Sequence, residues 1–150
     1  MEKTTKTKFY RCPVCGNVML VCVDSQVVPN CCNRPMELLE PHTQDEKQES
    51  HLPVADIVTE DTVRAHCDPF YLSHYNRRYH THICIGEQPH PMHASHHICF
   101  IYYETQQGGQ MRYLALDHPV DECFYSSQPP TAIYAYCNIH GLWKLNLNKD

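Results

Sequence analysis

Short apolar runs separated by polar turns make up most of this chain. After about residue 50, seven runs are rich in β-branched and aromatic residues: VADIV, YHTHICI, HICFIYY, MRYLAL, ECFY, TAIYAY and LWKL. None has the sustained 3.6-residue period of an amphipathic helix. Gln106-Gln107-Gly108-Gly109 has the composition of a hairpin connection, and Pro129-Pro130 excludes a helix at that point. Seven short strands predict an all-β sandwich.

A polar segment separates this region from a shorter one. PHTQDEKQES, residues 41–50, has no apolar periodicity and is interpreted as a linker. Before it, turn residues separate the runs VMLVCV, QVV and MELL, which predict short strands. A chain of 150 residues can bury one modest core together with one small stapled module. We therefore predict two domains, residues 1–40 and 41–150.

Charge and targeting signals exclude several classes of protein. The net charge is −5 and there is no basic stripe, so nucleic acid is not expected as a partner. The first residues contain no apolar segment of a signal peptide, and the longest apolar run, ICFIYY, is too short to span a bilayer. We expect a cytoplasmic protein without membrane association. In a reducing compartment, ten cysteines favour metal ligation over disulfides.

The first cysteine group has the composition of a closed metal site. Cys12 and Cys15 flank Pro-Val, and Cys31-Cys32 follow, so four thiolates can surround one zinc or iron ion. Neighbours on a strand point to opposite faces, so Cys31 and Cys32 can share a metal only if the backbone bends there. The spacing leaves open a structural zinc ion or a one-electron iron site. Cys22 lies within VMLVCV and is predicted to be a buried thiol.

A second group combines histidines with one cysteine. His90 and His96 lie at the two ends of a tight loop, and Cys137 and His140 can both reach a metal if the chain turns between them. Gly141 would ease that turn. With His51, these side chains would form a five-coordinate site with one open position. Around a divalent ion the net charge is about +1, which favours a small anion at that position.

The remaining histidines and cysteines are left outside the predicted ligand sets. His80 and His82 alternate on one strand face, and His93 and His97 flank the predicted ligands. The spacing gives no role to His42, His66, His74 and His118. Four cysteines in or near apolar strands are predicted to act as small hydrophobic residues: Cys67, Cys84, Cys99 and Cys123.

Two sets of motifs resemble a known family. CPVCGNVM…NCCNRPMELLE resembles desulforedoxin, and ESHLPV…HPMHASHHI…YCNIHGLWK resembles the catalytic domain of superoxide reductase, also called neelaredoxin. In this order they resemble desulfoferrodoxin, over nearly the whole chain. The resemblance implies a rubredoxin-like iron bound by Cys12, Cys15, Cys31 and Cys32. It also implies an immunoglobulin-like sandwich with a square-pyramidal iron, held by His51, His90, His96 and His140 in the equatorial plane and by axial Cys137.

The same resemblance implies an activity and partners. Superoxide would be reduced by one electron to hydrogen peroxide, with rubredoxin or a similar protein as electron donor and a homodimer as the assembly. Glu49 lies where the family has a ligand of the ferric state, and backbone N–H groups from Asn138 to His140 would tune the Cys137 sulfur. The sequence departs from the family at Ser50, where a catalytic lysine is usual, and Lys47 is the nearby candidate to compensate. RAHCDPFYLSHYNRRYH has the appearance of an insertion.

Two alternatives use the same residues differently. A histidine upstream of Cys-x-x-His in a β-sandwich is also compatible with a blue-copper electron carrier, although the tail LWKLNLNKD lacks an axial methionine. The cysteine group alone is compatible with a zinc-stapled binding module without redox activity. Neither alternative accounts for both HPMHASH and ESHLPV.

Overall fold

The chain forms two compact units, Met1–Glu40 and Pro41–Asp150, which are described here one at a time. This is a computed structural model, and it describes residues 6–44, 51–59 and 79–148. The predicted insertion lies almost entirely outside these ranges, as do Lys47, Glu49 and Ser50. Within the described ranges, no helix is long and apolar enough to cross a membrane.

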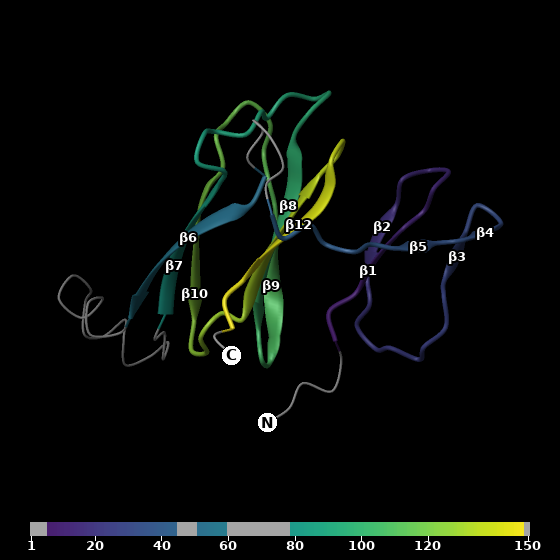
Figure 1. Ribbon diagram of the computed structural model, residues 1–150, viewed down its shortest axis with the longest axis horizontal. Helices are drawn as coiled ribbons and strands as arrows, with labels where there is room; N and C mark the ends of the chain where they lie inside the picture. Colours follow the sequence, from purple (N-terminus) through teal and green to yellow (C-terminus); the bar gives the residue numbers. More distant parts are fainter. Residues whose placement is uncertain (1–5, 45–50, 60–78, 149–150) are drawn as a thin grey trace. The chain divides into compact units, whose positions relative to one another are not determined.

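The first unit consists of very short strands and turns (Figure 1). Strands β1 (Phe9–Arg11), β2 (Val18–Leu20) and β5 (Glu37–Leu38) form an antiparallel sheet in the order β2-β1-β5. Strand β3 (Asn30–Cys31) pairs with β4 (Arg34–Pro35). The predicted strand at QVV is wrong, because Val27 and Val28 are exposed and lie in a loop.

The second unit contains seven described strands, one at each predicted apolar run. They are β6 (Pro53–Thr59), β7 (Tyr79–Ile85), β8 (Ile98–Thr105), β9 (Gly108–Tyr113), β10 (Asp121–Ser126), β11 (Ala132–Cys137) and β12 (Gly141–Asn146). One sheet has the order β10-β7-β6 and the other β12-β11-β8-β9, and all pairings are antiparallel. The predicted all-β sandwich is confirmed.

Alternation along the strands forms the core between these two sheets. Ile83, Ile85 and Phe124 of the first sheet belong to the same buried cluster as Ile101 and Ile133 of the second. Successive strand residues point to opposite faces, so the residues between them face outward. The hairpin between β8 and β9 turns at Gln106-Gln107, as its composition predicts.

Candidate metal centres

The four cysteines of the first unit converge on one point. The ligand atoms of Cys12, Cys15, Cys31 and Cys32 lie within 4.8 Å of one another. The Cys15 and Cys31 sulfurs are 3.6 Å apart, and those of Cys31 and Cys32 are 4.0 Å apart. Sulfurs bound at about 2.3 Å to one tetrahedral ion are separated by roughly 3.8 Å. The cluster therefore has the dimensions of a four-thiolate metal site.

A tight turn directs the side chains of the adjacent residues Cys31 and Cys32 toward the same site. Asn30 pairs with Pro35 and Cys31 with Arg34, leaving Cys32 and Asn33 as the two turn residues. Their φ angles are 54° and 58°, as a type I′ turn requires, and asparagine tolerates this conformation well. The bend allows both thiols to face the same point.

Backbone groups of the Cys12–Cys15 loop favour the thiolate form of Cys12. Backbone N–H groups of Val14 and Cys15 donate to Cys12 Sγ at 3.4 and 3.5 Å. The hydrogen bond from Cys15 is the largest of the effects that lower the pKa of Cys12 to about 6. Bonding to Cys15 and the other thiols raises the pKa of Cys32 to about 12. Without a cation the four thiols therefore cannot all ionise, and a bound metal ion removes that conflict.

Cys22 is not the buried thiol that the apolar run VMLVCV predicts. Strand β2 ends at Leu20, and Cys22 follows it with its side chain exposed. The run is too short to bury both of its ends in so small a unit. Cys22 lies outside the four-cysteine group.

Four imidazole rings form a closed quadrilateral in the second unit. Ring centroids are 4.7 Å apart for His51 and His90, 4.7 Å for His90 and His96, 5.0 Å for His96 and His140, and 4.7 Å for His140 and His51. The His51–His96 diagonal is longer, at 6.3 Å. Cys137 Sγ lies 3.7 Å from His140 Nδ1. The four histidines and the cysteine predicted as one ligand set are thus brought together.

Ligand atoms of His51, His96, His140 and Cys137 lie within 4.8 Å of one another, and the His90 ring lies beside them. His90 Nδ1 lies 2.7 Å from the Pro91 carbonyl, which can only accept, so Nδ1 carries the proton and Nε2 has the lone pair. Within the described residues, His96 Nε2 is buried and has no hydrogen-bond partner. His51 Nε2 and His140 Nδ1 are 3.0 Å apart. These nitrogens with Cys137 Sγ suit a nitrogen- and sulfur-binding metal ion.

Asn138 holds the two ligand loops together. Its side-chain oxygen accepts from the His97 N–H at 2.8 Å, and its Nδ2 donates to the Ser95 carbonyl at 3.1 Å. Its backbone N–H donates to the His97 carbonyl, so this N–H is not directed at the Cys137 sulfur as the sequence interpretation suggested. The clamp fixes His96, which lies between its two anchor residues, beside the end of β11.

The turn that carries Cys137 and His140 has the predicted form. Cys137 pairs with Gly141 across a three-residue connection, and Gly141 has a φ of 83°. The pairing of β11 with β8 shifts between Tyr136 and Cys137, where β8 accommodates Cys99 as an extra residue. Cys137 is 0% exposed, whereas His140 is exposed. The cysteine therefore lies on the protein side of the group and His140 at its solvent edge.

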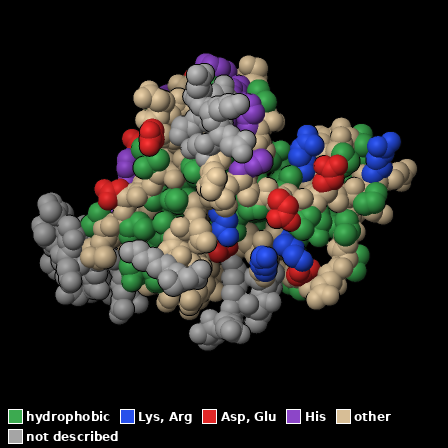
Figure 2. Space-filling view, in the orientation of Figure 1, with side chains coloured by type: hydrophobic (Ala, Val, Ile, Leu, Met, Phe, Trp, Pro, Cys, Tyr) green, Lys and Arg blue, Asp and Glu red, His purple; other side chains and the backbone are tan. Residues whose placement is uncertain are grey.

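Two aromatic residues that the sequence interpretation did not assign border this group. Trp143 stacks on His51 with ring centroids 4.6 Å apart at 12°, and its ring centroid also lies 4.7 Å from that of His42. His42 is held in a short bridge to β12, and no spacing signal could have identified it. A cleft of about 590 Å³ beside them is lined by Pro41, His42, Thr43, Gln44, His140 and Trp143. Figure 2 shows several histidine side chains gathered on one part of the surface.

The fold and the two clusters define a β-protein with one four-cysteine and one histidine–cysteine metal-binding group. Residues 43–146 match the family described as Desulfoferrodoxin. A desulfoferrodoxin homolog of Methanothermobacter thermautotrophicus is 33% identical over 143 residues, covering 93% of this chain and 98% of that protein. The desulfoferrodoxin of Syntrophotalea carbinolica is 27% identical over 138 residues, covering 92% and 94%. This chain belongs to the desulfoferrodoxin family.

A solved structure supports the fold separately. The superoxide reductase of Treponema pallidum has a TM-score of 0.70 at 18% identity, covering 94% of this chain and 98% of that one. Desulfoferrodoxins bind iron, and the two clusters fit the two iron sites. A blue-copper site uses two histidines and one cysteine, whereas four imidazoles gather here, so the copper alternative fits less well.

Proposed function

We propose that this chain is a superoxide reductase. Its histidine–cysteine group would convert superoxide to hydrogen peroxide, each superoxide taking up one electron and two protons. The four-cysteine group would hold a second iron that relays electrons from rubredoxin or a similar donor. The observation that carries the proposal is the quadrilateral of imidazoles beside Cys137, because four imidazoles and one thiol are enough for five protein ligands to one iron.

The proposed ligands are His51, His90, His96, His140 and Cys137. Iron held by them would supply the electron that reduces superoxide. His51 and His90 are 3% and 6% exposed, so their rings are fixed by packing and need little reorganisation. The Trp143 ring stacked on His51 fixes that imidazole further. These contacts keep the ligand atoms in place during repeated changes of redox state.

The exposure of the individual ligands indicates the side from which the substrate would reach the site. Cys137 is buried and His140 is exposed beside the cleft, so the substrate would arrive from the histidine side. The Cys137 thiolate would donate electron density to an iron held there. Protons would come from solvent. We extend the proposal to Glu49 as a ligand of the oxidised state and to Lys47 as a nearby positive charge, on the strength of the family resemblance.

A direct measurement of products tests this function. The purified, reduced protein is exposed to enzymatically generated superoxide, and hydrogen peroxide and oxygen are measured together with the oxidation of its iron. We expect peroxide to form and iron to be oxidised without oxygen evolution, and His90→Gln to abolish this while His118→Gln does not. Release of oxygen in step with superoxide consumption, in the absence of a reductant, would indicate a dismutase instead. Copper or zinc in the histidine–cysteine site of the purified protein would also contradict the proposal.

A further inference from the structure

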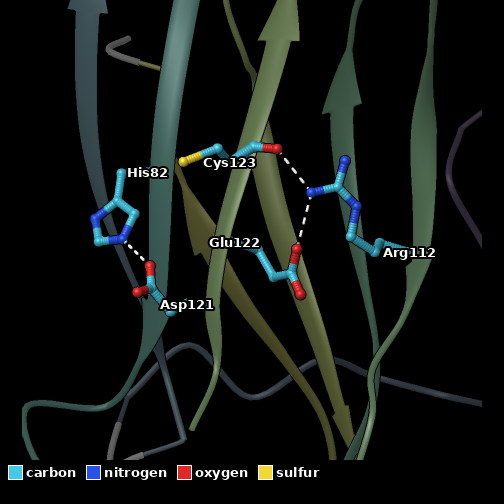
Figure 3. Close-up of polar contacts among 5 residues, drawn as sticks. All are labelled: His82, Arg112, Asp121, Glu122 and Cys123. Carbon is cyan, nitrogen blue, oxygen red and sulfur yellow. Dashed lines mark hydrogen bonds and ion pairs between the residues drawn. The ribbon is translucent and has the colours of Figure 1, made fainter. Parts of the chain in front are cut away.

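A third group of metal-ligand side chains lies on the β10-β7-β6 sheet. The ligand atoms of His82, Cys84 and Asp121 lie within 4.8 Å of one another. His82 Nε2 and an Asp121 carboxylate oxygen already form a hydrogen-bonded ion pair (Figure 3). None of these residues belongs to the two clusters described above.

Strand register brings the three side chains onto one face. On β7, His82 and Cys84 are two residues apart, and on β10 Asp121 lies directly opposite Cys84. Cys123 lies directly opposite His82 on the same face, next to the group of three. Ile83, between His82 and Cys84, and Phe124, next to Cys123, are fully buried in the core. The group therefore occupies the outward face of the sheet.

Arg112 fixes the edge strand from the opposite side. Its Nη1 donates to Glu122 Oε2 at 2.9 Å and to the Cys123 carbonyl at 2.7 Å, and its guanidinium lies 4.1 Å from the centre of the Phe124 ring. Figure 3 shows Arg112 on one side of β10 and the Cys123 sulfur directed toward the other. These contacts support the position of β10 and so the register of Asp121 and Cys123 with β7.

The donor set indicates which metal would bind. An imidazole nitrogen, a thiolate sulfur and a carboxylate oxygen together suit Zn²⁺, which takes four ligands at short range. Burial raises the pKa of Cys84, and the nearby Asp121 carboxylate adds to that effect. A divalent cation between the three would favour ionisation of the thiol and attract both negative groups.

We propose that His82, Cys84 and Asp121 bind one zinc-class divalent ion, with Cys123 or water as the fourth ligand. The ion would cross-link the edge strand β10 to the central strand β7. It would have a structural role that is independent of superoxide reduction. The sequence-based expectation that Cys84 and Cys123 act as small hydrophobic residues is replaced, since both are only half-buried on an outward face.

The test uses the full chain with iron in both clusters. Zn²⁺ is added under reducing conditions, and the metal content per chain is counted by native mass spectrometry. We expect one additional zinc ion without loss of iron, and Co²⁺ in its place should give a thiolate-to-cobalt absorption band. Cys84→Ser and Asp121→Asn should each weaken binding by roughly 100-fold or more, since each removes a direct ligand. Cys22→Ser and His118→Gln, which alter exposed residues outside the patch, should leave it unchanged.

Two results would overturn the site. One is that the iron-loaded native chain takes up no additional ion, or takes up zinc only as iron leaves. The other is that Cys84→Ser and Asp121→Asn bind zinc as tightly as the native protein does. Circular dichroism and the visible absorption of iron report folding of each variant. The near-isosteric Asp121→Asn keeps the experiment decisive if Cys84→Ser does not fold.

Discussion

The two iron-binding clusters differ in how much protein supports them. In the first unit Phe9 is buried, and the described apolar cluster consists of Tyr10, Cys12 and Met36, with Val21 and Cys31 packed against it. Two of the five residues in that apolar cluster are themselves cysteines of the metal site. In the second unit the histidine–cysteine group belongs to a sandwich whose described core cluster has ten buried residues, and further apolar side chains such as Phe100 and Leu142 are buried as well. Only Cys137 belongs to both that core and the group.

This difference indicates that the metal has different roles in the two units. A unit of forty residues buries too little apolar surface for independent stability, so metal binding provides much of its folding energy. Exposed Val14, Met19 and Val23 show how little apolar surface this unit covers. The sandwich has enough core to fold by itself and presents its ligands on a formed scaffold. The following predictions test that contrast.

Loss of the four-cysteine site should have the largest effect. Replacing Cys31 and Cys32 by serine removes a metal whose binding is worth about 10 kcal/mol or more, which exceeds the stability of so small a unit. We expect residues 1–40 to become susceptible to proteolysis while the second unit stays folded and its iron is still oxidised by superoxide. Cys22→Ser serves as the matched control. If the double variant loses the second iron although the sandwich remains folded, the two sites are not independent.

Truncating a core side chain of the sandwich should destabilise the second unit and leave the first unit unchanged. Ile133 is fully buried between the sheets, so Ile133→Ala should destabilise the sandwich by about 2–5 kcal/mol. Denaturant unfolding followed by Trp143 fluorescence would measure this loss of stability. The absorption of the four-cysteine iron should change at the same denaturant concentration as in the native protein. Leu116→Ala, at a partly exposed position, should have little effect. If Ile133→Ala lowered the stability measured from both transitions equally, the two units would unfold together.

Removal of the loop clamp should have an intermediate effect confined to the second cluster. Asn138→Ala deletes two side-chain hydrogen bonds, to the His97 N–H and the Ser95 carbonyl, at a total cost of about 1–3 kcal/mol. We expect faster loss of iron to a chelator from the histidine–cysteine group and no change at the four-cysteine group. Asn148→Ala, near the C-terminal end, is the control. An unchanged rate of iron loss would show that the clamp does not position His96.

Local motifs explain how much of the molecule could be predicted from sequence. The four-cysteine set and the HPMHASH and YCNIH segments carry their ligands at short, fixed spacings, and apolar runs rich in β-branched and aromatic residues predict all seven sandwich strands. The clamp at Asn138 and the contact between Trp143 and His51 depend on which loops meet in space. No spacing rule encodes such contacts.

The misses have a common physical cause. QVV and Cys22 were assigned from local hydrophobicity, but a unit with so small a core leaves apolar residues exposed. The patch at His82 and Asp121 depends on the register between β7 and β10, which is set by packing of the opposite face. In both cases the outcome depends on tertiary packing, which the local sequence does not specify.

The charge of the two units leads to a kinetic prediction. Residues 1–40 contain five Lys and Arg against four Asp and Glu, whereas residues 41–150 contain seven against thirteen. An anionic substrate is therefore attracted less by the second unit, and we expect Ser50→Lys to raise the rate of superoxide capture several-fold at low ionic strength. Lys47→Ala should lower it.

Pulse radiolysis across a salt series would measure this rate, and Lys144→Ala supplies a charge control elsewhere in the unit. The rate differences of Ser50→Lys and Lys47→Ala from the native protein should both shrink as salt is added, because screening weakens long-range attraction. If Ser50→Lys captures superoxide at the same rate as the native protein at every ionic strength, charge at this position does not control capture.

The smallest expected effect concerns an ion pair in the first unit. The Lys8 Nζ–Asp24 Oδ2 hydrogen bond lowers the pKa of Asp24, and the Gln26 N–H, 2.8 Å from Asp24 Oδ1, lowers it further. The same pair raises the pKa of Lys8. Asp24 therefore stabilises the unit above the ordinary carboxyl pKa, and this contribution disappears as the pH falls through the lowered pKa. The Lys8 contribution disappears only as the pH rises through its raised pKa.

Acid also protonates the cluster cysteines, so the informative quantity is the difference between native protein and Asp24→Asn. Followed through the absorption of the four-cysteine iron in denaturant, that difference should be greatest near neutral pH and vanish in acid. It should also shrink at high salt, since each side chain is about a quarter exposed. Asp117→Asn, at an exposed position in the second unit, should show no such dependence. If Asp24→Asn matches the native protein at every pH, the stability of the first unit depends on its metal and turns and not on this ion pair.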